Sequence, residues 1–302
     1  MGATASQYVD LMTKDFSKVW DDTLVADEPY FNEVVQVLQS NNQYERMSGL
    51  AGVAHFTQIS EGQEPPESNP KQKYDGKFTH LMYGLISRLT KNAMADDRTG
   101  LLREIPRMQA EAGKKTMETI VAAMFDRSQN GSYTGPDGKV LCATDHPRAD
   151  GGTWSNRPAT NADLGVAVLE SALTDFESTV DDYGDPAMPV PVMLLINQAN
   201  RWAATQLLEN FDKSGTTNRD INAVKNQFKG LRPFVWPYIT DTDSWYLLNE
   251  KVKRQIFVYM REALSKRFVT APDNTLDAIF QSWFRMVTGW VDARGVYGSV
   301  GG

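Results

Sequence analysis

The residues best suited to chemistry lie in one short stretch of the chain, KVLCATDHPRADGGTWSN, residues 139–156. It contains the only cysteine, Cys142, and three residues further on begins the pair Asp145 and His146. A thiol nucleophile needs a base within hydrogen-bond reach and a third group to orient that base. The stretch therefore raises three readings: a cysteine nucleophile with its base and carboxylate, half of a metal site, or an elaborate turn.

The spacing favours the turn. Catalytic cysteine and histidine are usually distant in sequence and close in space, whereas here both lie in one loop. In an extended chain, an aspartate next to its histidine points its carboxylate away from the imidazole. His-Pro and Asp-Gly-Gly are also good turn formers. We interpret the stretch as a structural turn and predict no catalytic residue in the chain.

Metal and cofactor sites are not predicted either. The other two histidines, His55 and His80, lie in a predicted hairpin where strand packing explains them. GSYTGPDGKV (131–140) lacks the spacing of a phosphate-binding loop, since Tyr133 and Val140 stand where glycine and serine or threonine are needed. The sequence contains no G-x-S-x-G, H-E-x-x-H or paired C-x-x-C motif.

Composition narrows the class of protein. The chain has 302 residues, 41% hydrophobic and 23% charged, with a net charge of -7, which is typical of a globular protein. The acidic balance argues against a protein that holds DNA through phosphate contacts. One cysteine allows no internal disulfide, the N-terminal residues lack the order of a secretion signal, and the apolar run PVPVMLLI is too short to span a bilayer. We expect a soluble cytoplasmic protein without a membrane partner.

The elements that surround the stretch predict a mixed α+β fold. Residues 101–128 have apolar residues at helical spacing with Pro106 in the first turn, and 160–179 predict a second helix capped by Thr160 or Asn161. A buried strand near 189–196, a helix after it and two strands within 230–250 predict a small α/β domain. The apolar alternation near the end predicts a terminal strand pair.

An extended hairpin is predicted before the first helix. Residues 51–60 and 76–90 are rich in β-branched and aromatic residues, and the proline-containing stretch 61–75 forms the tip. An isolated two-stranded hairpin is marginal in water, and apolar residues on both of its faces predict contacts with neighbouring molecules. The predicted inter-subunit contact residues are Phe56, Ile59, Phe78, Leu81, Met82, Tyr83, Leu85 and Ile86.

The order of these segments resembles the major capsid protein of tailed bacteriophages, with the Hong Kong 97 type fold, and in particular the Mu-like major head subunit. The resemblance rests on GLAGVAHFTQISEGQEPP, KFTHLMYGLISRLTKNAMADDR, LCATDHPRADGGTWSN, VPVMLLINQANRWAATQLL, RPFVWPYITDTDSWYLL and WVDARGVYGS. It implies an N-terminal arm (1–50), an extended β-hairpin loop (51–92), a peripheral domain with a long spine helix (93–159), an axial domain (160–265) and a return to the peripheral domain (266–302).

The resemblance also implies a function. Such proteins are not enzymes and carry no cofactor; they self-assemble as hexamers and pentamers into an icosahedral shell that encloses double-stranded DNA without sequence-specific binding. It implies scaffold, portal and decoration proteins as partners, assembly in the host bacterial cytoplasm and a final place in the virion. The alternatives are an encapsulin-like shell that stores cargo enzymes and a cytoplasmic enzyme that uses Cys142.

Overall fold

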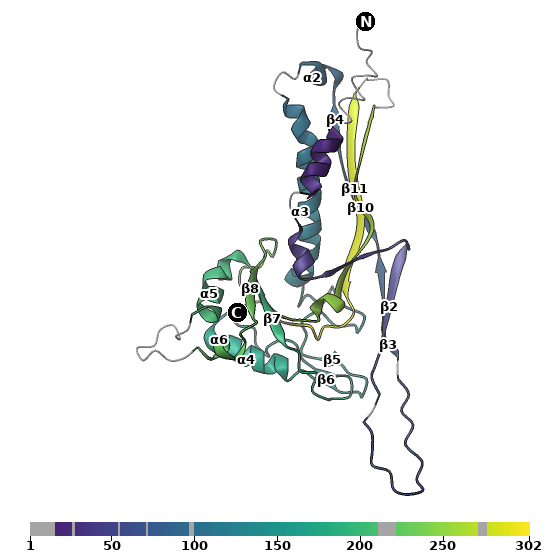
Figure 1. Ribbon diagram of the computed structural model, residues 1–302, viewed down its shortest axis with the longest axis vertical. Helices are drawn as coiled ribbons and strands as arrows, with labels where there is room; N and C mark the ends of the chain where they lie inside the picture. Colours follow the sequence, from purple (N-terminus) through teal and green to yellow (C-terminus); the bar gives the residue numbers. More distant parts are fainter. Residues whose placement is uncertain are drawn as a thin grey trace.

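Two separate four-stranded sheets form the framework of the protein. The computed structural model describes residues 16–25, 28–53, 55–70, 72–96, 100–210, 222–270 and 277–302. Figure 1 shows a long part that contains one sheet, a compact part that contains the other, and a two-stranded hairpin that projects from the place where they meet. This mixed α+β architecture agrees with the predicted class.

The long part is built on the strand order β1-β10-β11-β4. β1 runs parallel to β10, and the remaining neighbours are antiparallel. The strands are β1 (Gln36–Gln39), β4 (Leu81–Leu89), β10 (Ile256–Thr270) and β11 (Ala278–Trp290). Because β10 and β11 are the longest strands, they set the length of this part of the molecule.

Helix α3 (Glu104–Asp126) lies along this sheet and confirms the helix predicted within residues 101–128. Pro106 falls in its first turn, where the missing N–H leaves no bond unmade. Gly113 allows a close approach, because a Cβ there would lie 2.7 Å from the Leu264 side chain. Buried Gln109 fastens the helix to two strands: its Nε2 donates to Ser87 Oγ at 2.6 Å, and its Oε1 accepts from Ser282 Oγ at 2.8 Å.

A second contact holds the N-terminal segment to the same sheet. The helical residues 16–25 bury Phe16 and Trp20 against Phe280, and Phe16 also packs edge-on against Phe268 at 5.4 Å. Residues 1–15 of the predicted arm lie outside the described residues.

The compact part has the strand order β12-β9-β7-β8. β7 and β8 are parallel, so the chain between them crosses over through helices, as the predicted α/β pattern requires. Its elements are α4 (Val166–Glu177), β7 (Pro191–Ile196), α5 (Arg201–Leu208), α6 (Ala223–Gln227), β8 (Arg232–Val235), β9 (Trp245–Asn249) and β12 (Val296–Ser299). Helix α4 begins after Gly165, so the predicted caps Thr160 and Asn161 are wrong.

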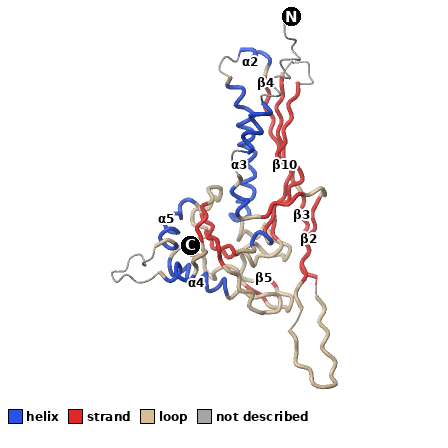
Figure 2. The backbone as a smooth tube through the Cα atoms, viewed as in Figure 1, coloured by secondary structure: helices blue, strands red, loops and turns tan. Residues whose placement is uncertain are grey.

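The predicted pairing of the hairpin is also wrong. The described residues of 51–60 lie in no strand; the hairpin consists of β2 (Tyr44–Leu50) and β3 (Gln72–Thr79), with loop between them (Figure 2). β4 instead pairs with β11, where Tyr83 stacks on Phe284 at 5.1 Å. β-Propensity indicates that a segment fits a sheet but does not identify the strand with which it pairs.

The predicted pairing of the two terminal strands is also wrong. β11 belongs to the long sheet, whereas β12 pairs with β9 in the compact part. The turn at residues 291–295 carries the chain from one sheet to the other. The short hairpin of β5 (His146–Pro147) and β6 (Thr153–Trp154) is linked to this turn, because the Asn156 side chain donates to the Ala293 carbonyl at 3.3 Å.

The aromatic contacts of Phe280 give a test of this packing. We expect Phe280→Ala to lower the free energy of unfolding by about 3–5 kcal/mol, since it removes a buried ring that contacts Phe16, Trp20 and Phe268. Phe56→Ala is the matched control and should change it by less than about 0.5 kcal/mol, because that ring is fully exposed. Chemical denaturation of the unassembled subunit measures both, and equal losses would contradict the assignment.

Candidate functional site

The structure separates the three residues that could have formed a thiol nucleophile site. Cys142 is fully buried, and burial raises the pKa of its thiol to about 12. The carboxylate of Asp145 pairs with Lys139, and the imidazole of His146 bonds to Asp137 and Asn156. Neither imidazole nitrogen of His146 is bonded to the thiol, so the arrangement has no activated nucleophile.

His146 instead forms a buried network of hydrogen bonds with Asp137 and Asn156, which we call the polar knot. Its Nδ1 lies 2.6 Å from an Asp137 carboxylate oxygen and its Nε2 lies 3.1 Å from Asn156 Oδ1. The side-chain amide of Asn156 donates to the backbone carbonyls of Leu141 and Val296, at 2.7 and 3.0 Å. The knot therefore joins the turn that contains His146 to the first residue of β12.

A second charged cluster lies beside this knot, where the hairpin meets the body. Lys73 Nζ lies 2.7 Å from Asp182 and 3.3 Å from Asp292, and the Arg294 guanidinium lies 2.9 and 3.1 Å from the same two carboxylates. We call these four residues the ionic quartet. Its charges balance, and it joins β3, the segment after α4 and the turn between β11 and β12.

Trp154 connects the knot to the ionic quartet. Its ring stacks on the His146 imidazole with centroids 4.5 Å apart, and the Arg294 guanidinium carbon lies 4.8 Å from its centroid. Burial alone would raise the pKa of the Asp292 carboxyl, but the charges of Arg294 and Lys73 outweigh it and hold that pKa below its usual value. The quartet was not predicted, because its members are distant in sequence and carry no motif.

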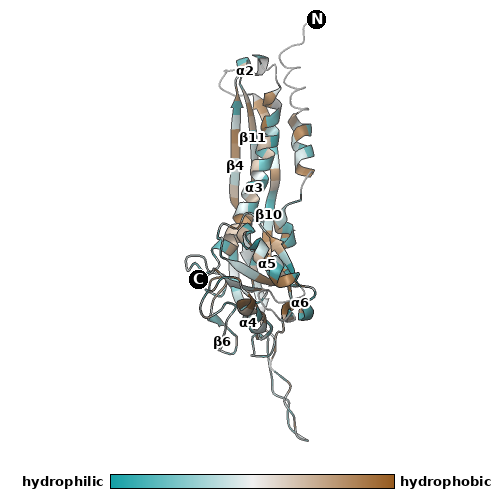
Figure 3. Cartoon of the chain, turned by 90° about the vertical axis from the view of Figure 1, so that its left-hand side faces the viewer, coloured by the Kyte–Doolittle hydropathy of each residue, from teal (hydrophilic) through white to brown (hydrophobic). Residues whose placement is uncertain are grey.

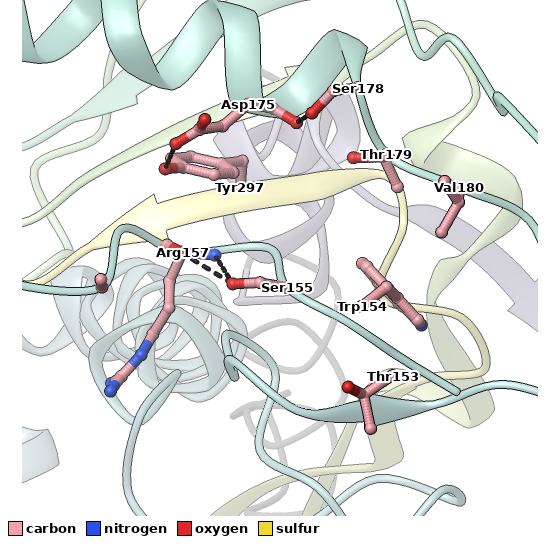
Figure 4. A pocket seen from close by; sticks show the side chains of 10 residues that line it. Thr153, Trp154, Ser155, Arg157, Asp175, Ser178, Thr179, Val180 and Tyr297 are labelled. Carbon is pink, nitrogen blue, oxygen red and sulfur yellow. Dashed lines mark hydrogen bonds between the residues drawn. The ribbon is translucent and has the colours of Figure 1, made fainter. Parts of the chain in front are cut away.

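A surface pocket of about 350 Å³ lies next to Trp154 and beneath the end of α4 (Figure 4). Its one carboxylate, Asp175, accepts a hydrogen bond from the Tyr297 hydroxyl at 3.0 Å. Ser178 donates its hydroxyl to the backbone carbonyl of Asp175. These bonds leave no nucleophile paired with a base among the described side chains of the pocket. The described residues also contain no group of three or more acidic, histidine or cysteine side chains placed to hold a metal ion.

The strongest surface feature is apolar. Four neighbouring side chains of β4 are each at least half exposed, and Phe56 in the loop after β2 is fully exposed. Figure 3 shows hydrophobic residues along β4 and β11. Because successive strand residues point to opposite faces, these β4 side chains lie on both faces of an edge strand, which indicates that the edge binds another molecule. The exposed β4 residues are Leu81, Met82, Leu85 and Ile86.

The eight predicted contact residues therefore divide into two groups. Phe78 packs edge-on against Phe257 at 4.9 Å, and Tyr83 stacks on Phe284, so both contribute to the subunit's own packing. The other six are exposed large hydrophobic residues: Phe56, Ile59, Leu81, Met82, Leu85 and Ile86.

Among the helices of the described residues, none has an apolar stretch that could span a bilayer.

The protein has an α+β fold with a projecting hairpin, a long helix on one sheet and an uncovered apolar strand. Residues 77–299 match the family model for phage capsid protein, and the chain belongs to that family. It is a structural protein of the phage head, which confirms the predicted capsid function and favours it over the encapsulin-like and enzyme alternatives. No curated protein matches the sequence.

Solved structures share the fold at low sequence identity. A structure from Mycobacterium phage Adephagia is 13% identical with a TM-score of 0.57, over 92% of both chains. One from Microbacterium phage Oxtober96 is 10% identical with a TM-score of 0.56, over 90% of both chains. A procapsid of bacteriophage JBD30 is 14% identical with a TM-score of 0.56, over 98% of this chain and 76% of the other. These likenesses confirm the Hong Kong 97 type fold; the Mu-like branch stays a prediction.

The polar knot predicts that substitution of His146 lowers the stability of the subunit. We expect His146→Gln to lower the free energy of unfolding by about 1–3 kcal/mol, because it removes a fully buried imidazole that bonds to Asp137 and Asn156. His55→Gln, at an exposed histidine, should cost less than about 0.5 kcal/mol. Denaturant titration of both variants measures the difference, and a similar small cost for His146→Gln would contradict the knot.

The ionic quartet predicts a dependence on pH. Because the folded pKa of Asp292 is depressed, its ionised form stabilises the protein above the ordinary carboxyl pKa of about 4, and this contribution is lost as pH falls through the folded value. The stability difference between the natural protein and Asp292→Asn should therefore be largest near pH 7 and shrink toward pH 3. Glu64→Gln, in the exposed loop, is the control, and a difference that does not change with pH would refute this role.

Proposed function

We propose that this chain is the repeating subunit of an icosahedral phage head and assembles as hexamers and pentamers around double-stranded DNA. The observation that carries the proposal is the set of six large apolar side chains on β4 and the loop after β2, which the subunit itself leaves uncovered. Exposed apolar area of this kind is costly in water and is recovered when subunits associate. The family match supports the same role.

The division of the chain follows from this role. Residues 1–50 act as an N-terminal arm, 93–159 and 266–302 form the peripheral domain around α3, and 160–265 form the axial domain. The region 51–92 was expected to be one extended hairpin. In our proposal the extended element is β2, β3 and the loop between them, while β4 belongs to the peripheral sheet.

The acidic balance of the subunit suits a container. A net charge of -7 limits adhesion of the shell to the DNA phosphates, so the genome is confined without sequence-specific binding. We propose that scaffold, portal and decoration proteins are its partners, that assembly takes place in the host bacterial cytoplasm, and that the assembled protein resides in the virion without any cofactor.

Charged substitutions on β4 test the assembly role. We expect Met82→Glu with Ile86→Glu to abolish shells, because two carboxylates would be buried between subunits, while the unfolding of the free subunit changes little at these exposed positions. Met82→Leu with Ile86→Val keeps the apolar surface and should assemble. Electron microscopy and sedimentation measure the outcome, and normal shells from the glutamate variant would refute the proposed role of β4.

A further inference from the structure

A single residue, His80, separates the projecting hairpin from the long sheet. Thr79 is the last residue of β3 that pairs with β2, opposite Tyr44, and Leu81 is the first residue of β4 that pairs with β11, opposite Met286. Figure 1 shows β3 in the hairpin and β4 in the long part. The chain therefore changes from one sheet to the other at His80, and the direction of the hairpin depends on how this residue packs.

The side chain of His80 is buried without a hydrogen bond. The residue is 4% exposed, and neither Nδ1 nor Nε2 has a hydrogen-bond partner in the described part of the chain. The Glu45 carboxylate of β2 lies 3.9 Å from Nε2, which is too far for a hydrogen bond. That carboxylate accepts hydrogen bonds instead from the Ser40 hydroxyl and, at 3.1 Å, from the side-chain amide of Asn42. A buried ring without partners lowers stability, and a positive charge on it lowers stability further.

The surroundings of His80 oppose its protonation. Burial lowers the pKa of the imidazole below its ordinary value, and the guanidinium groups of Arg285 in β11 and Arg261 in β10 act in the same direction. The Glu45 carboxylate favours the charged ring but does not outweigh burial. The phenol of Tyr259 in β10 adds no charge near neutral pH, because burial and Glu45 raise its pKa. The packed arrangement therefore favours a neutral imidazole.

We propose that His80 is an acid-sensitive hinge, whose neutral ring allows the hairpin to pack against the long sheet and whose protonation loosens that packing. We call the packed arrangement the closed state, and one in which water reaches the ring the open state. Protonation of a buried histidine is a local charge change that biases such a pair of states. The inference concerns the single subunit and does not depend on assembly.

The sign of the pH dependence follows from the two states. In the open state the ring has its ordinary pKa of about 6.5, and in the closed state its pKa is lower. The open state therefore binds the proton more readily, so the closed state loses stability as pH falls below about 6.5. The loss is complete once the pH is below the pKa of the closed state. Above about pH 7 the ring is neutral in both states and the hinge stays closed.

Two other contacts hold the hairpin while the hinge opens. Phe78 packs edge-on against Phe257, and this apolar contact has no group that titrates. Lys73 binds Asp292 in the ionic quartet, and the depressed pKa of that carboxyl keeps it ionised between pH 5 and 7. Opening at His80 is therefore local and does not detach the hairpin from the subunit.

Hydrogen exchange of the free subunit measures the hinge. From about pH 7.5 to about pH 5.5, protection factors of the amides at 78–82 should fall severalfold, by at most about tenfold per pH unit, because one proton is linked to opening. The amides of β7 are the internal control and should not follow this fall. His80→Gln should abolish the fall, whereas His55→Gln, at an exposed histidine, should retain it. The same pH dependence in the natural protein and His80→Gln would overturn the proposal.

A titration of the histidine rings tests the hinge without replacing His80. The chain has three histidines, His55, His80 and His146, so NMR can follow each ring from about pH 8 to about pH 5. We expect a midpoint below about 6.5 for His80. Glu45→Gln should lower it further, because this variant removes the carboxylate that favours the charged ring. A midpoint at or above about 6.5, or one that Glu45→Gln raises, would contradict the inference.

Discussion

The arrangement of the whole subunit depends on a charge-balanced junction around Trp154. Each of two cations there lies within 3.3 Å of both of two carboxylates, and the indole ring contacts one of the cations and a buried imidazole. Desolvating charges is costly unless each is paired and hydrogen-bonded. The quartet meets that condition only when Lys73 of the hairpin, Asp182 after α4 and the turn at 292–294 are together. The direction of the hairpin is thereby coupled to the contact between the two sheets.

A buried carboxylate of α3 strengthens the connection between this helix and the compact part. Glu118 of α3 accepts a hydrogen bond from Trp236 Nε1 at 2.8 Å, and burial raises the pKa of its carboxyl. Asp126, at the end of the same helix, accepts from the backbone N–H of Thr240 at 3.0 Å. The long helix therefore binds the loop between β8 and β9, so that the compact part cannot rotate about the helix without breaking the buried bond between Glu118 and Trp236.

Local pattern predicted the elements better than their pairing. The periodicity that predicted α3 and the apolar run that predicted β7 are properties of neighbouring residues, and both elements were found. Within α3, however, Met108 of the predicted apolar face is exposed and Gln109 is buried, since Gln109 meets hydroxyl groups of two strands. The partner of β4 and the quartet depend on residues about 200 positions apart, and no local rule contains that information.

The failure of Cys142 and His146 to form a nucleophile site also depends on contacts between residues distant in the sequence. Residues that look like a nucleophile and its base in a sequence need a shared cavity, and here the thiol packs beside Gly298 and Tyr246 while the imidazole turns to Asp137. A cysteine in such surroundings behaves as a small apolar residue. The turn interpretation rested on spacing and on turn-forming residues, and the structure supplies its reason: the side chains of His146 and Asn156 join this turn to the start of β12.

An open apolar edge such as that of β4 is a hazard for a free protein. Unpaired strand edges invite unspecific pairing with any exposed strand, and β4 has no charged side chain before Arg88 to prevent it. Two features oppose that outcome. The net charge of -7 keeps free subunits apart at long range, and the junction around Trp154 directs the loop away from its own β4. In the described part of the subunit β4 therefore stays an edge strand with exposed apolar side chains, which leaves it available to another molecule.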